Sequence, residues 1–308
     1  MALSKKWRHA IARVAICCAS FTAFDLAAAP AETAPGGLVW QIDGPKGRVF
    51  LVGSMHLLRR DRPALPAVIK SAYREAESLV MEIDVDAVAD EAMAALLLET
   101  ATYADDRKLP QVIGKARWRK LRPVLARVNV PEGFAETLEP WGIAMLLTTL
   151  EYSRLGFDPE IGVEKQLQNL AARDRKSIDG LETVEFQLGL LDALPAAEQL
   201  QLLDMTVKDI DDMPKAVDEL YFAWRAGDLQ RLDNLLLEGY RDLPRLYADL
   251  VERRNRNWLP QLHALLEREG DTLVVVGALH LVGDRGLLRL LETDGLKVGP
   301  YQPAKTPP

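Results

Sequence analysis

The chain has 308 residues, of which 48% are hydrophobic, and its formal net charge is -7. This length and composition suit one large domain or two small ones with a packed core. An acidic chain of this kind is a poor candidate for general nucleic-acid binding, so we expect no nucleic-acid partner.

The first 29 residues have the pattern of a secretory signal peptide. Four basic residues precede a mostly apolar stretch at 14–24, and small residues at 27–29 offer a cleavage site. The apolar stretch is too short for a good membrane span, and an uncleaved anchor is the alternative interpretation. Residues 30–37 follow as a Pro/Ala/Gly linker. We therefore expect a periplasmic or secreted protein with no stable membrane span after cleavage.

Both cysteines of the chain, Cys17 and Cys18, lie inside this predicted signal peptide. The mature chain would therefore contain no disulfide, no thiol nucleophile and no thiolate metal ligand. Its chemistry would have to use histidines, carboxylates, asparagine, arginine, hydroxyls or a bound metal ion.

The segment after the linker predicts a hairpin that leads into a strand–helix–strand unit. Residues 38–42 and 48–53 have the pattern of two strands joined by a Gly/Pro turn. Residues 65–76 carry apolar side chains at helical spacing, and 78–84 form another apolar strand. The two strands of such a unit are normally parallel neighbours, so we expect the strand 78–84 to lie beside the strand 48–53.

The middle of the chain, about 86–270, is rich in Ala, Leu, Glu and Arg, and Pro and Gly residues divide it into several predicted helices. A short strand is expected at 177–179. A second strongly apolar strand, 272–276, follows this helical insertion. A helix at 287–292 and an edge strand at 297–301 complete the predicted elements.

These elements predict an α/β (α+β) fold. A small mixed sheet would form from both ends of the chain, with the large helical insertion between them. We expect residues 38–301 to form the domain and residues 302–308 a short tail.

Two of the predicted strands end in the same motif, Gly-x-x-His-Leu. Gly53 precedes His56 in the first, and Gly277 precedes His280 in the second. Glycine leaves room above a strand end, and open α/β sheets bind ligands beyond the carboxyl ends of their strands. A single histidine in this position is more often structural, but the repetition favours one site shared by both histidines. His263, in a Leu-rich helical stretch, is expected to be structural or exposed.

Glu82 lies in an apolar strand, where a buried carboxylate needs a partner or a position at the strand end. Together with His56 and His280 it would form a common ligand set for a divalent metal ion. Such an ion, with Mn, Co and Zn as the candidates, would make bound water a usable nucleophile near neutral pH. A salt bridge at the strand end is the alternative role for Glu82.

Arg254 and Asn255 lie in a basic, amide-rich helical segment shortly before the second Gly-x-x-His strand. Their side chains could hold a substrate carbonyl or carboxylate through hydrogen bonds. A solvated helix face with intrahelical ion pairs is an equal alternative on the sequence alone. Glu182 and Gln187 have the pattern of a pair at a helix start.

Taken together, these motifs resemble the TraB/GumN family, which includes the Tiki membrane-linked proteases. The resemblance covers about residues 38–301. It rests on Trp40, Leu-Val-Gly-Ser-Met-His at 51–56, Met-Glu-Ile-Asp at 81–84, Gly-Val-Glu at 162–164, Leu-Glu-Thr-Val-Glu-Phe-Gln at 181–187, Arg-Asn at 254–255 and Val-Gly-Ala-Leu-His-Leu-Val-Gly at 276–283.

The resemblance implies an α/β core related to erythromycin esterase-like and haem-binding ChaN-like proteins. It also implies a metal-dependent peptidase activity, as in Tiki members, carried by the positions matching His56, Glu82 and His280. Arg254 and Asn255 match the polar pair of the family. Glu164 matches as well, at a position to which we assign no role.

We therefore expect a metal-dependent hydrolase that cleaves peptides or proteins. His56 and His280 would bind the ion, Glu82 would ligate it or act as general base, and Arg254 and Asn255 would orient the scissile carbonyl. One alternative is a protein that binds a peptide or haem without turnover. Another is a metal-free, esterase-like enzyme with a histidine as general base. The sequence does not indicate the oligomeric state.

Overall fold

The computed structural model describes residues 38–84 and 90–303 of the chain. The predicted signal peptide and linker lie outside the described residues, as does most of the predicted tail. No helix in the described part of the chain is both long and apolar enough to cross a membrane.

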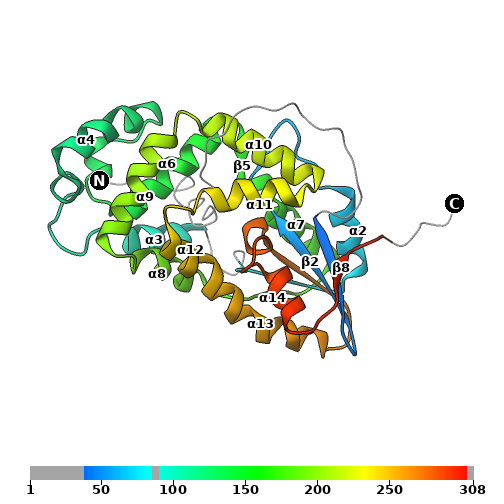
Figure 1. Ribbon diagram of the computed structural model, residues 1–308. Coiled ribbons are helices and arrows are strands. Elements are labelled where there is room, and N and C mark those ends of the chain that lie inside the picture. The colour runs from blue at the N-terminus through cyan, green and yellow to red at the C-terminus, as the bar shows by residue number, and fades with distance from the viewer. Residues whose placement is uncertain (1–37, 85–89, 304–308) are drawn as a thin grey trace.

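Six strands form one mixed sheet in the order β6-β4-β7-β2-β1-β8 (Figure 1). Strands β6, β4, β7 and β2 are parallel, and β1 is antiparallel to both β2 and β8. This confirms the expected mixed sheet, in which five strands come from the two ends of the chain and β6 comes from the helical insertion between them. The strands are β1 (Val39–Asp43), β2 (Arg48–Ser54), β4 (Ser78–Met81), β6 (Ile178–Gly180), β7 (Thr272–Gly277) and β8 (Val298–Pro300).

The late strand β7 lies between β4 and β2, so the expectation that β4 lies beside β2 is wrong. Val275 of β7 is opposite Val52 on one side and opposite Met81 on the other. All residues of β7 are buried, and its unbroken apolar sequence is typical of a strand covered on both faces. Strand β7 therefore occupies a central place in the sheet, between the two strands β2 and β4 of the strand–helix–strand unit.

Helices make up most of the remaining structure, as the sequence predicts. They are α2 (Ala67–Glu75), α3 (Asp90–Ala101), α4 (Leu109–Arg127), α5 (Glu132–Ala135), α6 (Pro140–Arg154), α7 (Val163–Asp174), α8 (Val184–Asp192), α9 (Ala196–Asp209), α10 (Met213–Ala226), α11 (Leu229–Glu238), α12 (Pro244–Tyr247), α13 (Arg253–Leu266) and α14 (Leu287–Thr293). The helices α4, α6 and α9 pack together at the end of the molecule away from the six-stranded sheet (Figure 1).

Prolines mark several helix starts. They occupy the first or second residue of α4, α6, α10 and α12, where the missing backbone N–H costs no hydrogen bond. The prolines expected to divide the helical region thus include Pro110, Pro214 and Pro244, each of which stands at the beginning of a helix. A second, two-stranded sheet of β3 (Leu58–Arg59) and β5 (Phe157–Asp158) was not expected from the sequence.

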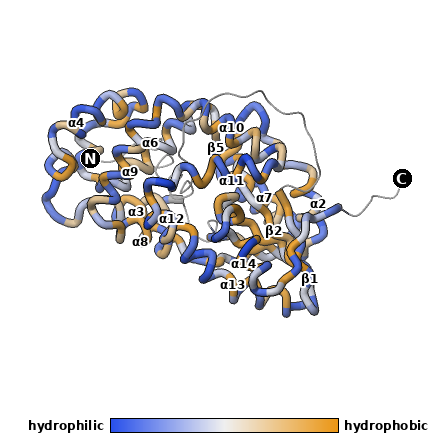
Figure 2. Tube along the Cα trace, viewed as in Figure 1, coloured by the Kyte–Doolittle hydropathy of each residue, from blue (hydrophilic) through white to orange (hydrophobic). Residues whose placement is uncertain are grey.

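Alternate residues of the central strands point into two separate cores. Phe50 and Val275 belong to the core that the sheet shares with α2 and the helical region, while Leu51 and Val274 pack with residues of α13 and α14. Figure 2 shows strong hydrophobic colour along β2. Because both faces are covered, polar chemistry on this sheet is confined to the strand ends.

Candidate active site at the strand ends

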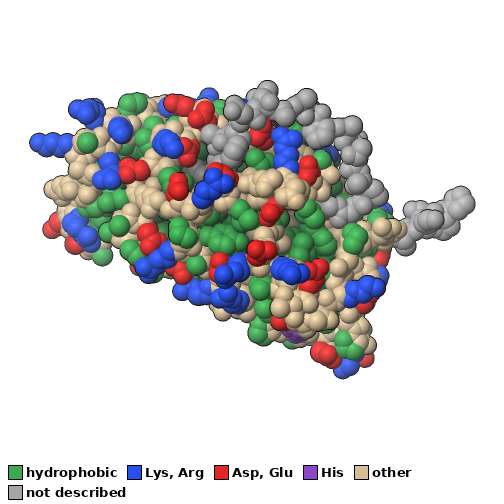
Figure 3. Space-filling view, viewed as in Figure 1, with side chains coloured by type: hydrophobic (Ala, Val, Ile, Leu, Met, Phe, Trp, Pro, Cys, Tyr) green, Lys and Arg blue, Asp and Glu red, His purple; other side chains and the backbone are tan. Residues whose placement is uncertain are grey.

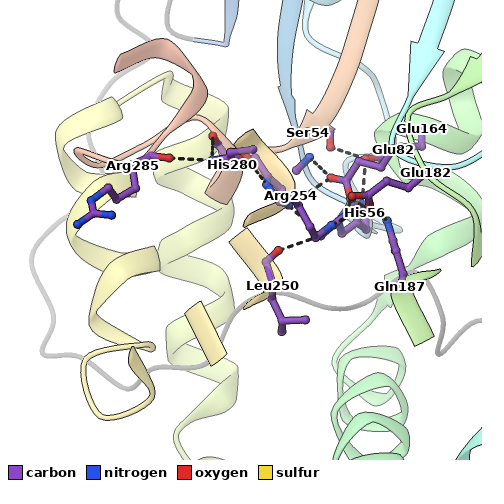
Figure 4. Close-up of polar contacts among 12 residues, drawn as sticks. Ser54, His56, Glu82, Glu164, Glu182, Gln187, Leu250, Arg254, His280 and Arg285 are labelled. Carbon is purple, nitrogen blue, oxygen red and sulfur yellow. Dashed lines mark hydrogen bonds and ion pairs between the residues drawn. The ribbon is translucent and has the colours of Figure 1, made fainter. Parts of the chain in front are cut away.

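Three of the residues predicted to form a site meet at the carboxyl edge of the parallel strands (Figure 4). His56 follows the end of β2, Glu82 directly follows β4, and His280 ends η5 (Ala278–His280), the 3-10 helix after β7. Because β7 separates β4 from β2, three successive strands each bring one side chain to the same edge. Glu82 Oε1 lies 3.9 Å from His280 Nε2.

Each glycine of the two Gly-x-x-His motifs leaves space that residues of the other motif's strand end occupy. A β-carbon at Gly277 would lie 3.2 Å from His56 Nε2 and 3.3 Å from Glu82 Oε1, so both atoms border the space over this glycine. The Gly277 N–H also donates to Glu82 Oε1, at 2.7 Å. A β-carbon at Gly53 would lie 2.9 Å from Cδ1 of Leu281, the residue after His280. The repeated glycine therefore reflects close packing of the two strand ends.

Glu164, at the start of α7, holds the ring of His56. Nδ1 of His56 lies 2.9 Å from Glu164 Oε1, and Ser54 Oγ donates to the same oxygen. The helix can come this close because a β-carbon at Gly162, its N-cap, would overlap the carbonyl oxygen of His56. Burial opposes a charge on the ring, but the Glu164 carboxylate outweighs it and raises the pKa of His56 to about 9.

Asn255, in α13, holds the ring of His280. Nδ1 of His280 lies 2.7 Å from Asn255 Oδ1, and Nδ2 of Asn255 donates to the carbonyls of His280 and Arg285 at 3.1 and 2.9 Å. Since an amide oxygen can only accept, Nδ1 carries the proton and Nε2 keeps its lone pair. Burial lowers the pKa of His280 to about 3, with Glu82 opposing the shift and Arg254 adding to it.

Arg254 contacts Glu82, Glu182 and His280, and its side chain is only 5% exposed. Its Nε donates to Glu182 Oε2 at 2.8 Å, and its Nη2 donates to Glu82 Oε2 at 2.6 Å. Its Nη1 lies 3.1 Å from both the Leu250 carbonyl oxygen and His280 Nε2. All three nitrogens of the guanidinium therefore have protein partners.

Glu182 is a second buried carboxylate of the site. Nε2 of Gln187 lies 3.2 Å from Glu182 Oε2 and 3.4 Å from Glu82 Oε2, so one amide bridges both groups. Burial raises the pKa of Glu182. Burial also opposes ionisation of Glu82, but Arg254 and the two histidines outweigh it and hold the pKa of Glu82 well below its ordinary value.

Sequence reasoning missed part of this arrangement. Helix α8 does begin after Thr183, close to the predicted start, but Glu182 and Gln187 point into the site. Glu164 matched the family motif without a role, and the structure places it against His56. His263 was expected to be structural or exposed, and this is confirmed. Its side chain is 41% exposed, and its Nε2 lies 3.1 Å from Asp294 Oδ2, apart from the cluster.

The donor atoms of the cluster fit a divalent ion in kind. Two imidazole Nε2 atoms and one carboxylate oxygen are present, and both rings are held through Nδ1, as second-shell partners hold histidine ligands. Within the described residues, however, no group of three or more His, Cys, Asp or Glu side chains is arranged to hold a metal ion. Arg254 Nη1 takes the lone pair of His280 Nε2 that an ion would need.

The fold and the site define an α/β protein with a histidine–carboxylate cluster at the ends of its parallel strands. A model of the TraB/PrgY/gumN family matches residues 38–300, and the chain belongs to this family. The resemblance inferred from the motifs is thereby confirmed.

Two curated relatives carry the name uncharacterized protein YbaP. The protein from Escherichia coli (strain K12) is 29% identical over 248 residues, which cover 80% of this chain and 89% of the relative. The protein from Shigella flexneri is 28% identical over 241 residues, which cover 78% of this chain and 86% of the relative. No solved structure matches the chain significantly.

Proposed function

We propose that the protein is a metal-dependent hydrolase that cleaves peptides or proteins. The observation that carries this proposal is the meeting of His56 Nε2, Glu82 Oε1 and His280 Nε2 at one strand edge. These three groups would hold a divalent ion such as Mn²⁺, Co²⁺ or Zn²⁺. Such an ion, when bound, supplies an activated water molecule and polarises the substrate carbonyl.

Of the two roles expected for Glu82, that of ligand is the better supported. Arg254 and the histidines hold its pKa well below the ordinary value, which makes its carboxylate a weak proton acceptor. The same low pKa keeps Glu82 negatively charged over the whole neutral range, as a ligand for a cation must be.

Arg254 and Asn255 act as positioning residues in this proposal. Their hydrogen-bonding groups already face protein partners, so they orient Glu82 and His280 rather than the scissile carbonyl. Arg254 would have to give up its contact with His280 Nε2 when an ion binds, while its bonds to the two carboxylates could persist.

The substrate class and the location rest on the sequence. The resemblance to the Tiki proteases supports peptides or proteins as substrates, and the pattern of residues 1–29 supports export to the periplasm or beyond. N-terminal sequencing of the protein purified from its own cells tests export, because cleavage would leave a chain that begins near residue 30.

The decisive experiment measures metal-restored cleavage. The chain without residues 1–29 is stripped with a chelator and incubated with a mixed peptide library, with and without Mn²⁺, Co²⁺ or Zn²⁺, and products are identified by mass spectrometry. We expect products only with metal, and a loss of about a thousandfold or more in His56→Ala and His280→Ala. His263→Ala, an exposed histidine on α13, is the matched control and should retain activity. Metal-dependent cleavage that survives both site variants would refute the proposal.

A metal-free hydrolase is the second candidate, and the contact between Arg254 Nη1 and His280 Nε2 favours it. In that enzyme the buried carboxylates and histidines would transfer protons directly. A chelator would leave its activity unchanged, whereas His280→Ala would still abolish it. If a folded protein yields no products, affinity for peptides, or a Soret band on haem titration, would instead support binding without turnover.

A further inference from the structure

The far end of the helical region carries a strongly basic helix on an acidic protein. Residues 107–127 contain eight Lys and Arg residues and no Asp or Glu, whereas the whole chain has 38 basic and 45 acidic residues. Figure 3 shows several basic side chains at this end of the molecule, where Figure 1 places α4. We propose that α4 docks the protein on an anionic phospholipid bilayer.

The positive charge of α4 is only partly neutralised by neighbouring carboxylates. Four of the eight basic residues form ion pairs: Arg107 with Asp105, Arg117 with Asp204, Arg122 with Glu132, and Arg127 with Glu151 and Asp211. Three further cations, Lys115, Arg119 and Lys120, are exposed and form no ion pair with any residue that the structure describes. These three charges are therefore available to an anionic partner.

The packing of α4 determines which side faces outward. Gly114, with φ of 80°, separates a short first part from the continuous helix that follows. Leu121, Val124 and Leu125 are buried in the core, so the apolar side of the helix is already covered. Residues 115, 119 and 122 share the opposite side at i, i+4 and i+7 spacing, and the half-buried Trp118 lies at its edge.

These features favour a bilayer over other anionic partners. Lys115 and Arg119 lie on the side of α4 that faces away from its buried residues, Lys120 lies on a flank, and a half-buried tryptophan beside cations suits the interface between headgroups and water. Since the apolar side of α4 is covered, binding would be electrostatic and would weaken with added salt. The remaining acidic surface would be repelled by the same membrane, which would orient the protein with α4 against the lipid.

This proposal does not depend on the proposed hydrolase activity. The docking helix lies at the opposite end of the molecule from the strand ends (Figure 1). A failure of either proposal would therefore leave the other standing.

The test is sedimentation with vesicles of phosphatidylcholine alone or mixed with phosphatidylglycerol. The chain used begins at residue 30, because the apolar stretch before it could bind vesicles by itself. We expect binding only to the anionic vesicles, and loss of binding in high salt. In the triple variant K115Q/R119Q/K120Q the partition coefficient should fall by about a hundredfold, since each removed charge contributes about fivefold.

The matched control is the triple variant K70Q/R268Q/K297Q, which removes three exposed basic residues far from α4 and changes the net charge equally. It should bind as the parent does. Tryptophan emission should shift to the blue on binding, and Trp118→Phe should remove most of the shift. Absence of binding to anionic vesicles at low salt, or equal loss in both triple variants, would overturn the proposal. Tighter binding to a soluble polyanion than to vesicles, with no change in Trp118 emission, would overturn it in favour of an acidic macromolecule.

Discussion

The two histidines that follow the Gly-x-x motifs differ in what holds their Nδ1 atoms. His56 faces the carboxylate of Glu164, with 18% of its side chain exposed, and its pKa is raised to about 9. His280 faces the amide of Asn255, with 6% of its side chain exposed, and its pKa is lowered to about 3. One motif thus carries a cationic ring and the other a neutral ring at neutral pH.

The comparison shows that the position of the histidine ring and its charge have different origins. Gly-x-x-His places an imidazole at the sheet edge in both cases, because the glycine allows close packing of the strand ends. The charge of each imidazole is set by its surroundings: the Glu164 carboxylate of α7 raises the pKa of His56, whereas burial, together with Arg254 of α13, lowers the pKa of His280. In the proposed hydrolase, metal binding would release a proton from His56 but not from His280.

Removing Arg254 should have the largest effect on stability. Arg254→Met would leave Glu82 and Glu182 buried without their cation, so we expect the free energy of unfolding in urea to fall by about 3–5 kcal/mol. The loss of a positive neighbour should also raise the pKa of His280, which would make the two histidines more alike. Arg253→Met, next to it and 52% exposed, is the control and should cost less than about 1 kcal/mol. Equal losses in both variants would contradict the buried network.

The pH dependence of stability should show the two histidines acting in opposite directions. The pKa of His56 in the folded state, about 9, exceeds its ordinary 6.5, so its contribution is full below pH 6.5 and is lost as pH rises to about 9. The pKa of His280 in the folded state, about 3, lies below 6.5, so its contribution is full above pH 6.5 and is lost as pH falls. The contribution of His56 should amount to about 3 kcal/mol and that of His280 to about 5 kcal/mol, since one pKa unit corresponds to about 1.4 kcal/mol.

Unfolding in urea over this pH range measures both contributions. His56→Gln should flatten the alkaline side of the profile, whereas His280→Gln should leave that side unchanged and flatten the acidic side. If His56→Gln left the alkaline side unchanged, the Glu164 interaction would not govern this titration.

Glu164→Gln should lower the free energy of unfolding by about 2 kcal/mol at neutral pH. The reason is that the hydrogen bond between the charged Glu164 and His56 side chains is replaced by a neutral one. The pKa of His56, followed by NMR of the ring, should fall from about 9 toward 6.5, while that of His280 should stay low. Metal affinity, measured by calorimetry, should fall about 10- to 100-fold if His56 is a ligand. Glu185→Gln, an exposed glutamate on α8, is the control and should change neither quantity.

The two glycines should give the smallest changes in stability. Gly53→Ala presses only on the flexible end of Leu281, and we expect a cost of about 1 kcal/mol with activity largely retained. Gly277→Ala should cost a similar free energy but place a methyl group against His56 and Glu82, so in the proposed hydrolase cleavage should fall about a hundredfold. Full activity in Gly277→Ala would show that the reaction does not use the space over this glycine.

The sequence alone predicted the elements and much of the site. Unbroken apolar runs indicated the strands, and prolines marked helix boundaries, because both signals are local. The repeated Gly-x-x-His motif and Glu82 located the strand-end cluster, since the carboxyl ends of parallel strands necessarily share one edge. Local sequence patterns were sufficient to predict the position of a residue wherever backbone geometry alone decides that position.

Only the tertiary structure decided the strand order and the electrostatics. Insertion of β7 between β4 and β2 depends on which strand best fills a place covered on both sides, a competition among distant segments. Glu164, Glu182 and Arg254 act on the site from helices and loops distant in the sequence, and nothing local to those residues shows which charges they will meet. Because a pKa depends on burial and on neighbours within a few ångströms, the opposite states of two identical motifs arise only when the chain has folded.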